Sequence, residues 1–170
     1  HVLSLGKKAN DVFKRTENHS EAGLGAEPYT IFDDLTFENT AKIVEQLMTM
    51  FANGEYDRIV VVYNKFRNAA SQDVTIEQML PVQPGEAGTA ERKAKTEYIF
   101  EPNRKEIIER IIPNSIKLQL FKALLDSQAS EHGARMTAMH KATDNATDLL
   151  KELKLTYNKA RQASITNEIL

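Results

Sequence analysis

The feature of this sequence that most restricts its fold is the stretch from Ser115 to Leu170, which contains one glycine, Gly133, and no proline. Glycine and proline are the residues that most disfavour a helix interior, so this stretch predicts one continuous helix. Such a helix would be about 80 Å long. That length exceeds the diameter of any globular domain that a chain of 170 residues forms, so most of the helix is expected to protrude.

An apolar stripe follows this predicted helix at alternating spacings of four and three residues. A heptad-like stripe that continues for more than five repeats is typical of one half of a coiled coil. No other segment of the chain has the length to cover the stripe, so a partner helix is expected. The alternative is a helix that folds back at Thr143–Asn145, where helix propensity is weak, but this site has neither glycine nor proline. The stripe contains Leu125, Ala129, His132, Met136, Met139, Thr143, Ala146, Leu150, Leu153, Tyr157, Ala160 and Ser164.

About the first hundred residues show a different pattern, in which strand-like runs alternate with helix-like runs. Ile59–Tyr63 is an unbroken apolar run, which predicts a central strand covered on both faces. Thr36 is expected to cap a helix that ends at Asn53 and Gly54. This alternation predicts an α/β fold with a Rossmann-like layered domain. The other predicted elements are strands at Val2–Gly6, Val74–Val82 and Tyr98–Phe100 and a helix at Lys7–Arg15.

We therefore expect two parts, a globular α/β domain over residues 1–112 and a long helix over residues 113–170. Pro113 marks the boundary, because proline lacks a backbone donor and interrupts a helix. On this interpretation Asn103 caps a short helix before the proline, and Asn114 caps the long helix after it.

The composition excludes several classes of function. A formal net charge of −2 provides no basic field that would attract nucleic acid. Cysteine is absent, which excludes disulfides, thiolate catalysis and cysteine zinc sites. The apolar runs of the sequence are far shorter than a membrane span.

The sequence also lacks motifs for catalysis or ligand binding. Gly23-Leu24-Gly25 lacks the third glycine of a dinucleotide-binding turn, and no Walker-type phosphate loop occurs. His132 and His140 are eight residues apart on one predicted helix, too far to chelate one ion together. The sequence therefore predicts no catalytic residue, no metal site and no cofactor.

Three segments of the long helix form a specific pattern. Ala129–Met139 reads ASEHGARMTAM, Lys141–Ala146 reads KATDNA, and Tyr157–Ile169 reads YNKARQASITNEI. Together they resemble the C-terminal helix of the gamma subunit of the rotary (F-type) ATP synthase, whose pattern is ASE-x-x-ARM-x-AM, ATDNA and YNKARQA-x-IT-x-E. The preceding α/β part agrees with the family in its order along the chain.

The resemblance implies a non-catalytic rotor shaft. In the family, the long helix is half of an antiparallel coiled coil inside a hexamer of alpha and beta subunits. This central stalk transmits torque between the membrane rotor ring and that catalytic hexamer during proton-driven ATP synthesis. A gamma subunit of a bacterium would be peripheral, at the cytoplasmic face of the inner membrane.

The resemblance also assigns contact residues by their place in the motifs. Arg161, Gln162 and Thr166 match residues that hydrogen-bond a beta-subunit loop, and Glu168 lies beside them. Arg135, lower on the shaft, is expected to be a further contact with beta. An arginine suits this role because its guanidinium makes a charge-assisted bond to a carboxylate.

A second contact region is implied at the base of the shaft. Tyr98, Phe100 and Glu101 resemble the foot of the family's globular domain, which meets the epsilon subunit and the membrane rotor ring. The local motif is short, so this assignment depends on fewer residues than the beta-subunit contacts.

The sequence departs from the family in three respects. The family's long N-terminal helix, the first strand of its globular domain and its C-terminal tip have no counterpart, so we expect the chain to be a fragment. Gly133 replaces a larger helix former, which should cost up to about 1 kcal/mol of local helix stability. Without the missing helix, the exposed stripe is expected to pair with a second copy of the chain, antiparallel and two-fold symmetric.

Two other functions remain open from the residues alone. An unrelated coiled-coil scaffold would explain the stripe, and a small nucleotide-binding α/β domain would explain the alternation of strands and helices. The scaffold leaves the polar ARQ-x-x-IT-x-E pattern unexplained, and the nucleotide-binding domain lacks a phosphate loop.

Overall fold

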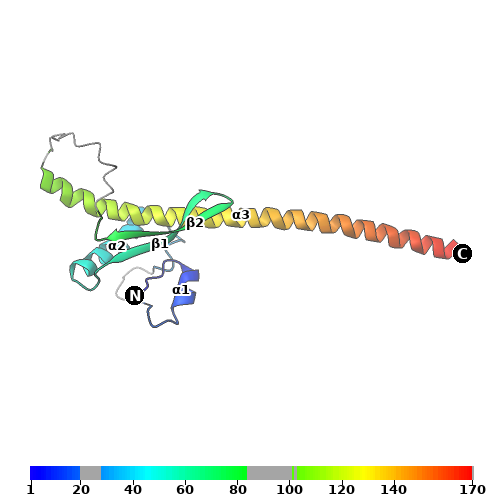
Figure 1. Cartoon of the computed structure of the whole chain (residues 1–170), viewed down its shortest axis with the longest axis horizontal. Helices are drawn as coiled ribbons and strands as arrows, with labels where there is room; N and C mark the ends of the chain where they lie inside the picture. Colours follow the sequence, from blue (N-terminus) through cyan, green and yellow to red (C-terminus); the bar gives the residue numbers. More distant parts are fainter. Residues whose placement is uncertain (20–27, 84–100, 102, 170) are drawn as a thin grey trace.

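The structure of the chain, a computed structural model, describes residues 1–19, 28–83, 101 and 103–169. One helix runs along the whole length of the molecule, and the other elements pack beside its first half (Figure 1). In chain order the elements are α1 (Lys7–Phe13), α2 (Phe37–Ala52), β1 (Ile59–Asn68), β2 (Ser71–Leu80) and α3 (Arg104–Ile169).

The long helix α3 begins where the sequence predicts a cap. The Asn103 side-chain oxygen accepts a hydrogen bond from the Lys105 backbone N–H at 3.2 Å, which satisfies one of the free donors of the first turn. The helix then continues through Pro113 without a break. The prediction that Pro113 separates two helices, with Asn114 as a second cap, is therefore wrong.

The helix continues through Pro113 because the turns that follow it are packed into the core, which offsets the backbone hydrogen bond that proline removes. A proline inside a helix removes one hydrogen bond to the carbonyl four residues earlier. Ile116 and Leu120, within two turns of the proline, are 5 % and 2 % exposed and belong to the core. Their burial holds the chain in the helical direction and offsets the lost bond.

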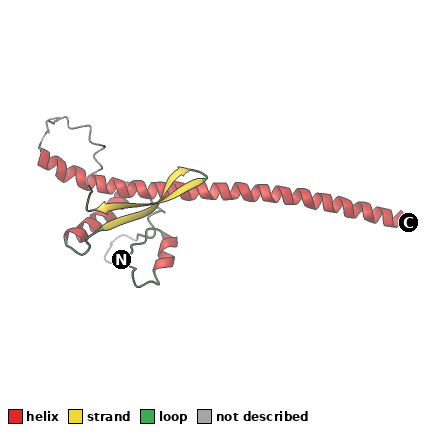
Figure 2. Cartoon of the chain, viewed as in Figure 1, coloured by secondary structure: helices red, strands yellow, loops and turns green. Residues whose placement is uncertain are grey.

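Strands β1 and β2 form an antiparallel hairpin, in which Val62 lies opposite Ile76 and Tyr63 opposite Thr75. Both predicted strands are confirmed, although the second begins at Ser71 and ends at Leu80. Figure 2 shows this hairpin lying against α3. Among the described residues the sheet has these two strands, and α3 contacts both of them.

The expectation that Ile59–Tyr63 is covered on both faces is wrong. Tyr63 is 7 % exposed, whereas Val62 is 64 % exposed and its cross-strand neighbour Ile76 is 70 % exposed. An apolar run predicts burial, but only neighbouring elements supply it, and the described part of the chain covers one face of this hairpin.

The remaining elements follow the predictions more closely. Thr36 caps α2, because its hydroxyl oxygen accepts a hydrogen bond from the Asn39 backbone N–H at 3.3 Å. After α2, Gly54 has a φ of 76°, the left-handed conformation that commonly ends a helix. Val2–Gly6 is not a full strand, since it makes a single bridge from Val2 to His19. The predicted strand at Tyr98–Phe100 lies outside the described residues.

The hydrophobic core lies between α2, the end of the hairpin and the first half of α3. Its most buried side chains are Ile43, Val44, Met79 and Leu120, each at most 2 % exposed. Lys117 of α3 also pairs with Glu45 of α2 at 2.5 Å. The first half of α3 is therefore part of the globular part of the molecule.

Tyr63 is the buried polar group of the hairpin. Its hydroxyl donates a hydrogen bond to the Glu77 carboxylate at 2.7 Å. Burial, and then the neighbouring Glu77, raises the pKa of Tyr63 to about 12, because both disfavour the phenolate.

We expect Leu120→Ala to lower the free energy of unfolding by about 3 kcal/mol, because it leaves a cavity in the core. Leu118→Ala is the matched control, since it lies two residues away on α3 and is 59 % exposed, against 2 % for Leu120. Chemical denaturation measures both variants. An equal loss in the two variants would contradict this packing.

The raised pKa of Tyr63 predicts a pH dependence of stability. A phenol with a higher pKa in the folded chain stabilises the fold below its unfolded value of 10.0, and this contribution is lost as the pH rises to about 12. The free energy of unfolding should therefore fall across this pH range, and we expect Tyr63→Phe to remove the part of the fall that Tyr63 causes. Denaturation at several pH values measures it. Tyr157→Phe, at a site that is 66 % exposed, is the control and should keep the decline.

Candidate functional site on the long helix

Helix α3 has two halves with different surroundings. Up to Thr137 its residues alternate between buried and exposed positions as they pass the hairpin and α2. From residue 138 to residue 168 every residue is exposed, and this half extends away from the other elements (Figure 1). Its length is about 45 Å. A surface of this shape is suited to contact other chains rather than to enclose a small molecule.

The predicted apolar stripe lies on this helix and is exposed. Met139 is 64 % exposed, Leu150 52 %, Leu153 60 % and Tyr157 66 %. Exposed apolar area of this extent is typical of an interface rather than of a free surface.

The alternative in which the helix folds back at Thr143–Asn145 is wrong, because α3 is continuous there. The hydroxyls of Thr143 and Thr147 donate hydrogen bonds to the carbonyls four residues earlier, at 3.0 and 2.9 Å. Because these hydroxyls bond to carbonyls of the helix itself, they do not form the alternative side-chain hydrogen bonds that would favour a turn.

Four of the residues assigned to the beta-subunit contact, Arg161, Gln162, Thr166 and Glu168, lie in the last three turns of α3 and are exposed. At about 100° per residue, Gln162 and Thr166 project from the side of the helix opposite the apolar stripe. Arg161 and Glu168, seven residues apart, project together near the edge of the stripe. A partner on the stripe would thus leave Gln162 and Thr166 free for a second partner.

The charged and polar groups of this cluster differ in how they are held. Thr166 donates its hydroxyl proton to the Gln162 carbonyl at 2.9 Å, so its oxygen remains able to accept. Among the described residues Arg161 makes no ion pair, so its guanidinium is available to a carboxylate outside the chain.

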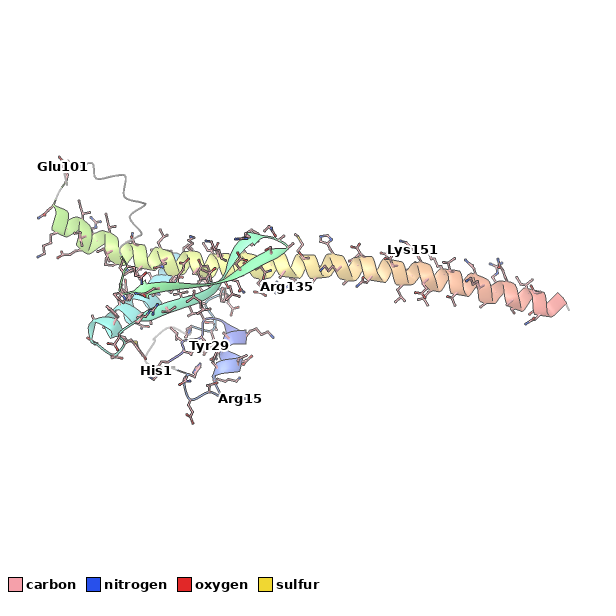
Figure 3. The ribbon with its side chains drawn as sticks, in the orientation of Figure 1. His1, Arg15, Tyr29, Glu101, Arg135 and Lys151 are labelled. Atoms are coloured by element: carbon pink, nitrogen blue, oxygen red, sulfur yellow. The ribbon has the colours of Figure 1, made fainter. Side chains whose placement is uncertain are left out.

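Arg135 lies in a different environment, close to the point where the hairpin crosses α3 (Figure 3). It forms an ion pair with Glu131 and donates a second hydrogen bond to His132 Nδ1 at 3.2 Å. Both partners are exposed, so the pair adds little to stability but keeps the guanidinium along the helix. Arg135 is therefore less free than Arg161 to contact another chain.

The second predicted contact region is described only at Glu101. This residue is exposed and lies beside the first turn of α3, at the opposite end of the molecule from the C-terminal cluster (Figure 3). Tyr98 and Phe100 lie outside the described residues.

A cavity of about 600 Å³ is lined by the N-terminal segment, α2, β1 and the first half of α3. Apolar side chains such as Leu3, Phe13, Val60 and Val62 form much of its wall. Its described lining includes no glycine and no carboxylate, the groups that would hold phosphates and a magnesium ion. The cavity therefore gives no support to the nucleotide-binding alternative.

The described ranges of the chain contain no cluster of three or more metal-ligating side chains. In the same residues no helix combines the length and the apolar character that crossing a membrane requires.

One polar cluster was missed by the sequence analysis. Ser130, 0 % exposed, donates its hydroxyl proton to the Asn64 carbonyl at 3.1 Å, and Gln72 donates to the Ser130 carbonyl at 3.0 Å. These bonds join the hairpin to α3. The available signal was the pair of small residues Ser130 and Gly133. Small residues permit close packing, but they do not identify the segment that packs against them.

The chain matches the family model described as ATP synthase over residues 1–170. It is 55 % identical over 169 residues to the ATP synthase gamma chain of Christiangramia forsetii, covering 99 % of this chain and 56 % of the relative. The gamma chains of Cytophaga hutchinsonii and Geotalea daltonii are 47 % and 39 % identical, with the same coverage. The chain thus spans a little over half the length of these relatives.

Two solved structures share the fold. One is described as the Euglena gracilis mitochondrial ATP synthase, OSCP/F1/c-ring, in rotational state 3, with a TM-score of 0.59 and 23 % identity over 99 % of this chain and 58 % of that chain. The other is the rotor of the same assembly in rotational state 1, with a TM-score of 0.55 and 23 % identity over 96 % of this chain and 62 % of that chain. At this identity the likeness concerns the fold alone.

Proposed function

The chain belongs to the gamma-chain family of ATP synthase, and we propose that it forms part of a central rotor stalk. In this role it transmits torque between a membrane rotor ring and a catalytic hexamer of alpha and beta subunits during proton-driven ATP synthesis. The observation that carries the proposal is the exposed half of α3, from residue 138 to residue 168, which extends well beyond the core.

The shape of α3 supports a mechanical role. Its 66 residues give a length of about 100 Å, while its first half is fixed by the core. A shaft changes the state of surrounding subunits only if its contacts differ between those states. Gln162 and Thr166 lie on the side of α3 opposite the apolar stripe. This difference between two sides gives the shaft the asymmetry that such contacts require.

We assign no chemistry to the chain itself. The ATP-hydrolysing or ATP-forming site belongs, on this proposal, to the surrounding subunits, and the chain needs no cofactor. An unrelated coiled-coil scaffold is not favoured, because the family match includes the α/β part as well as the helix. A nucleotide-binding domain is not favoured either, because the described cavity has an apolar wall.

The proposed partners meet the two ends of α3. Arg161, Gln162, Thr166 and Glu168 would contact a beta subunit at the C-terminal end, with Arg135 as a weaker contact lower on the shaft. Exposure of the whole cluster supports this assignment. Tyr98, Phe100 and Glu101 would meet an epsilon subunit and the rotor ring, and the position of Glu101 beside the start of α3 agrees with that arrangement.

We also propose a location and a division of the chain. The chain would be peripheral, at the cytoplasmic face of a bacterial inner membrane, because the three gamma chains compared above come from bacteria. The division into a globular part over residues 1–112 and a shaft over residues 113–170 remains a proposal. In that division the first turns of the shaft, including Leu120, are anchored in the core.

The beta-subunit contact is tested in an assembled synthase that contains this chain within its full-length subunit. We expect the double change Arg161→Leu and Gln162→Leu to lower ATP turnover about tenfold, because it removes a charge-assisted and a neutral hydrogen bond across the contact. Steady-state hydrolysis and proton-driven synthesis both report the loss.

The matched control is the double change Lys141→Leu and Asn145→Leu. These residues are exposed on the part of the helix surface away from the apolar stripe, several turns nearer the core, and outside the proposed contact. The control should keep its turnover. Full turnover in the Arg161 and Gln162 double variant would contradict the contact assignment.

We further propose that the isolated chain pairs with a second copy through the apolar stripe. Leu153→Glu should produce a monomer, because it places a charge in the middle of the buried stripe. Leu155→Glu is the control, since Leu155 is 62 % exposed, against 60 % for Leu153, but lies off the stripe. Light scattering measures the mass of each variant across concentration. A monomeric unmodified chain at every concentration would rule out the pairing.

A further inference from the structure

We propose that the turn of the β1–β2 hairpin and a notch on α3 form the joint that fixes the shaft helix to the globular part. The notch consists of Ser130, Gly133 and Thr137, which share one side of the helix at spacings of three and four residues. This inference rests on the proposed function, and it assigns a positioning role to residues outside the proposed partner contacts.

Gly133 provides the floor of the notch. A Cβ atom added at this position would lie 3.0 Å from the Ala69 Cα and 3.2 Å from the Ala69 carbonyl oxygen, both in the hairpin turn. Such distances are shorter than ordinary van der Waals contact, so any side chain larger than glycine displaces backbone here. The glycine that weakens helix propensity therefore allows the hairpin to approach α3.

Side-chain hydrogen bonds flank this contact on both sides. Toward the start of α3, Ser130 donates to the Asn64 carbonyl at 3.1 Å, and Gln72 donates to the Ser130 carbonyl at 3.0 Å. Toward its end, Thr137 Oγ1 lies 3.0 Å from both the Ala69 and the Gly133 carbonyl oxygens. Its single proton is shared between the two acceptors.

The chemistry of these contacts suits a joint that resists rotation. Apolar packing is non-directional, so core contacts alone would allow a helix to turn or slide by small amounts. Hydrogen bonds fix both distance and angle. Bonds on both sides of the Gly133 contact therefore fix the rotation of α3 relative to the hairpin.

The position of the joint suits torque transmission. Thr137 is half-buried, and every residue of α3 from 138 to 168 is exposed. A twisting force applied along that half reaches the globular part first at the notch. The joint is thus at the base of the protruding shaft, where the load enters the core.

The first test compares Gly133→Leu with Ala134→Leu. Ala134 is the exposed neighbour on the same helix, so its variant places the same leucine side chain outside the notch. We expect Gly133→Leu to speed hydrogen exchange of the backbone amides of residues 68–72 at least about tenfold, while Ala134→Leu leaves them unchanged. Unchanged exchange in Gly133→Leu, or an equal increase in both variants, would overturn the joint.

Thr137→Val keeps the test decisive if Gly133→Leu does not fold. This change removes the shared hydroxyl and nearly preserves the side-chain volume, so we expect about fivefold faster exchange in the same amides. Spin labels offer a second measure, because the chain has no native cysteine. Labels at Ala70→Cys and Lys141→Cys should show a narrow distance distribution that broadens with Thr137→Val. No change in either measurement would overturn the joint.

The final test separates the joint from the proposed function. An assembled synthase that contains this chain within its full-length subunit is prepared unmodified, with Thr137→Val and with Ala134→Leu. Failure of the unmodified chain to support turnover would overturn the proposed function and, with it, the joint. Normal ATP turnover with the unmodified chain, together with lower turnover for Thr137→Val than for Ala134→Leu, supports both the proposed function and the joint. Equal turnover of all three would leave the stalk role standing and overturn the joint.

Discussion

The contact between the β1–β2 hairpin and the first half of α3 is the interaction on which the rest of the structure depends. A two-stranded hairpin is marginally stable in water by itself, and a long isolated helix gains little from propensity alone. Each element here stabilises the other through the buried side chains Tyr63, Met79 and Leu120 and through the bonds at Ser130. Helix α2 completes the same core with Ile43 and Val44.

This arrangement explains how one helix serves two purposes. Its first half is a core element, with residues such as Ile116 and Leu124 at 5 % exposure. Its second half is exposed, with Gln162 and Thr166 on the side opposite the apolar stripe. The proposed stalk needs both halves, because a shaft transmits torque only if one part is fixed while the other contacts its surroundings.

The predictions from sequence were accurate where local rules decide the outcome. The caps at Thr36 and Asn103, the end of α2 at Gly54 and the two strands of the hairpin are all confirmed. They failed where a distant element decides, as at Pro113 and on the outer face of Ile59–Tyr63. The exposure of Arg161, Gln162, Thr166 and Glu168 agrees with their assigned role, which remains a prediction. The small residues at Ser130 and Gly133 permit a close approach, but the local pattern does not identify the hairpin turn as the segment that approaches.

The sequence by itself determined the continuous helix, its apolar stripe and the family to which the chain belongs. These properties depend on residue order along one element, because helix periodicity and motif spacing are local. Only the tertiary structure decided which half of that helix is buried, which face of the hairpin is covered and why position 133 is a glycine. Those outcomes depend on approach between segments about 60 residues apart in the chain, such as Ala69 and Gly133. Helix propensity at Gly133 indicated a defect, whereas the structure indicates close packing, because a Cβ atom there would lie 3.0 Å from the Ala69 Cα.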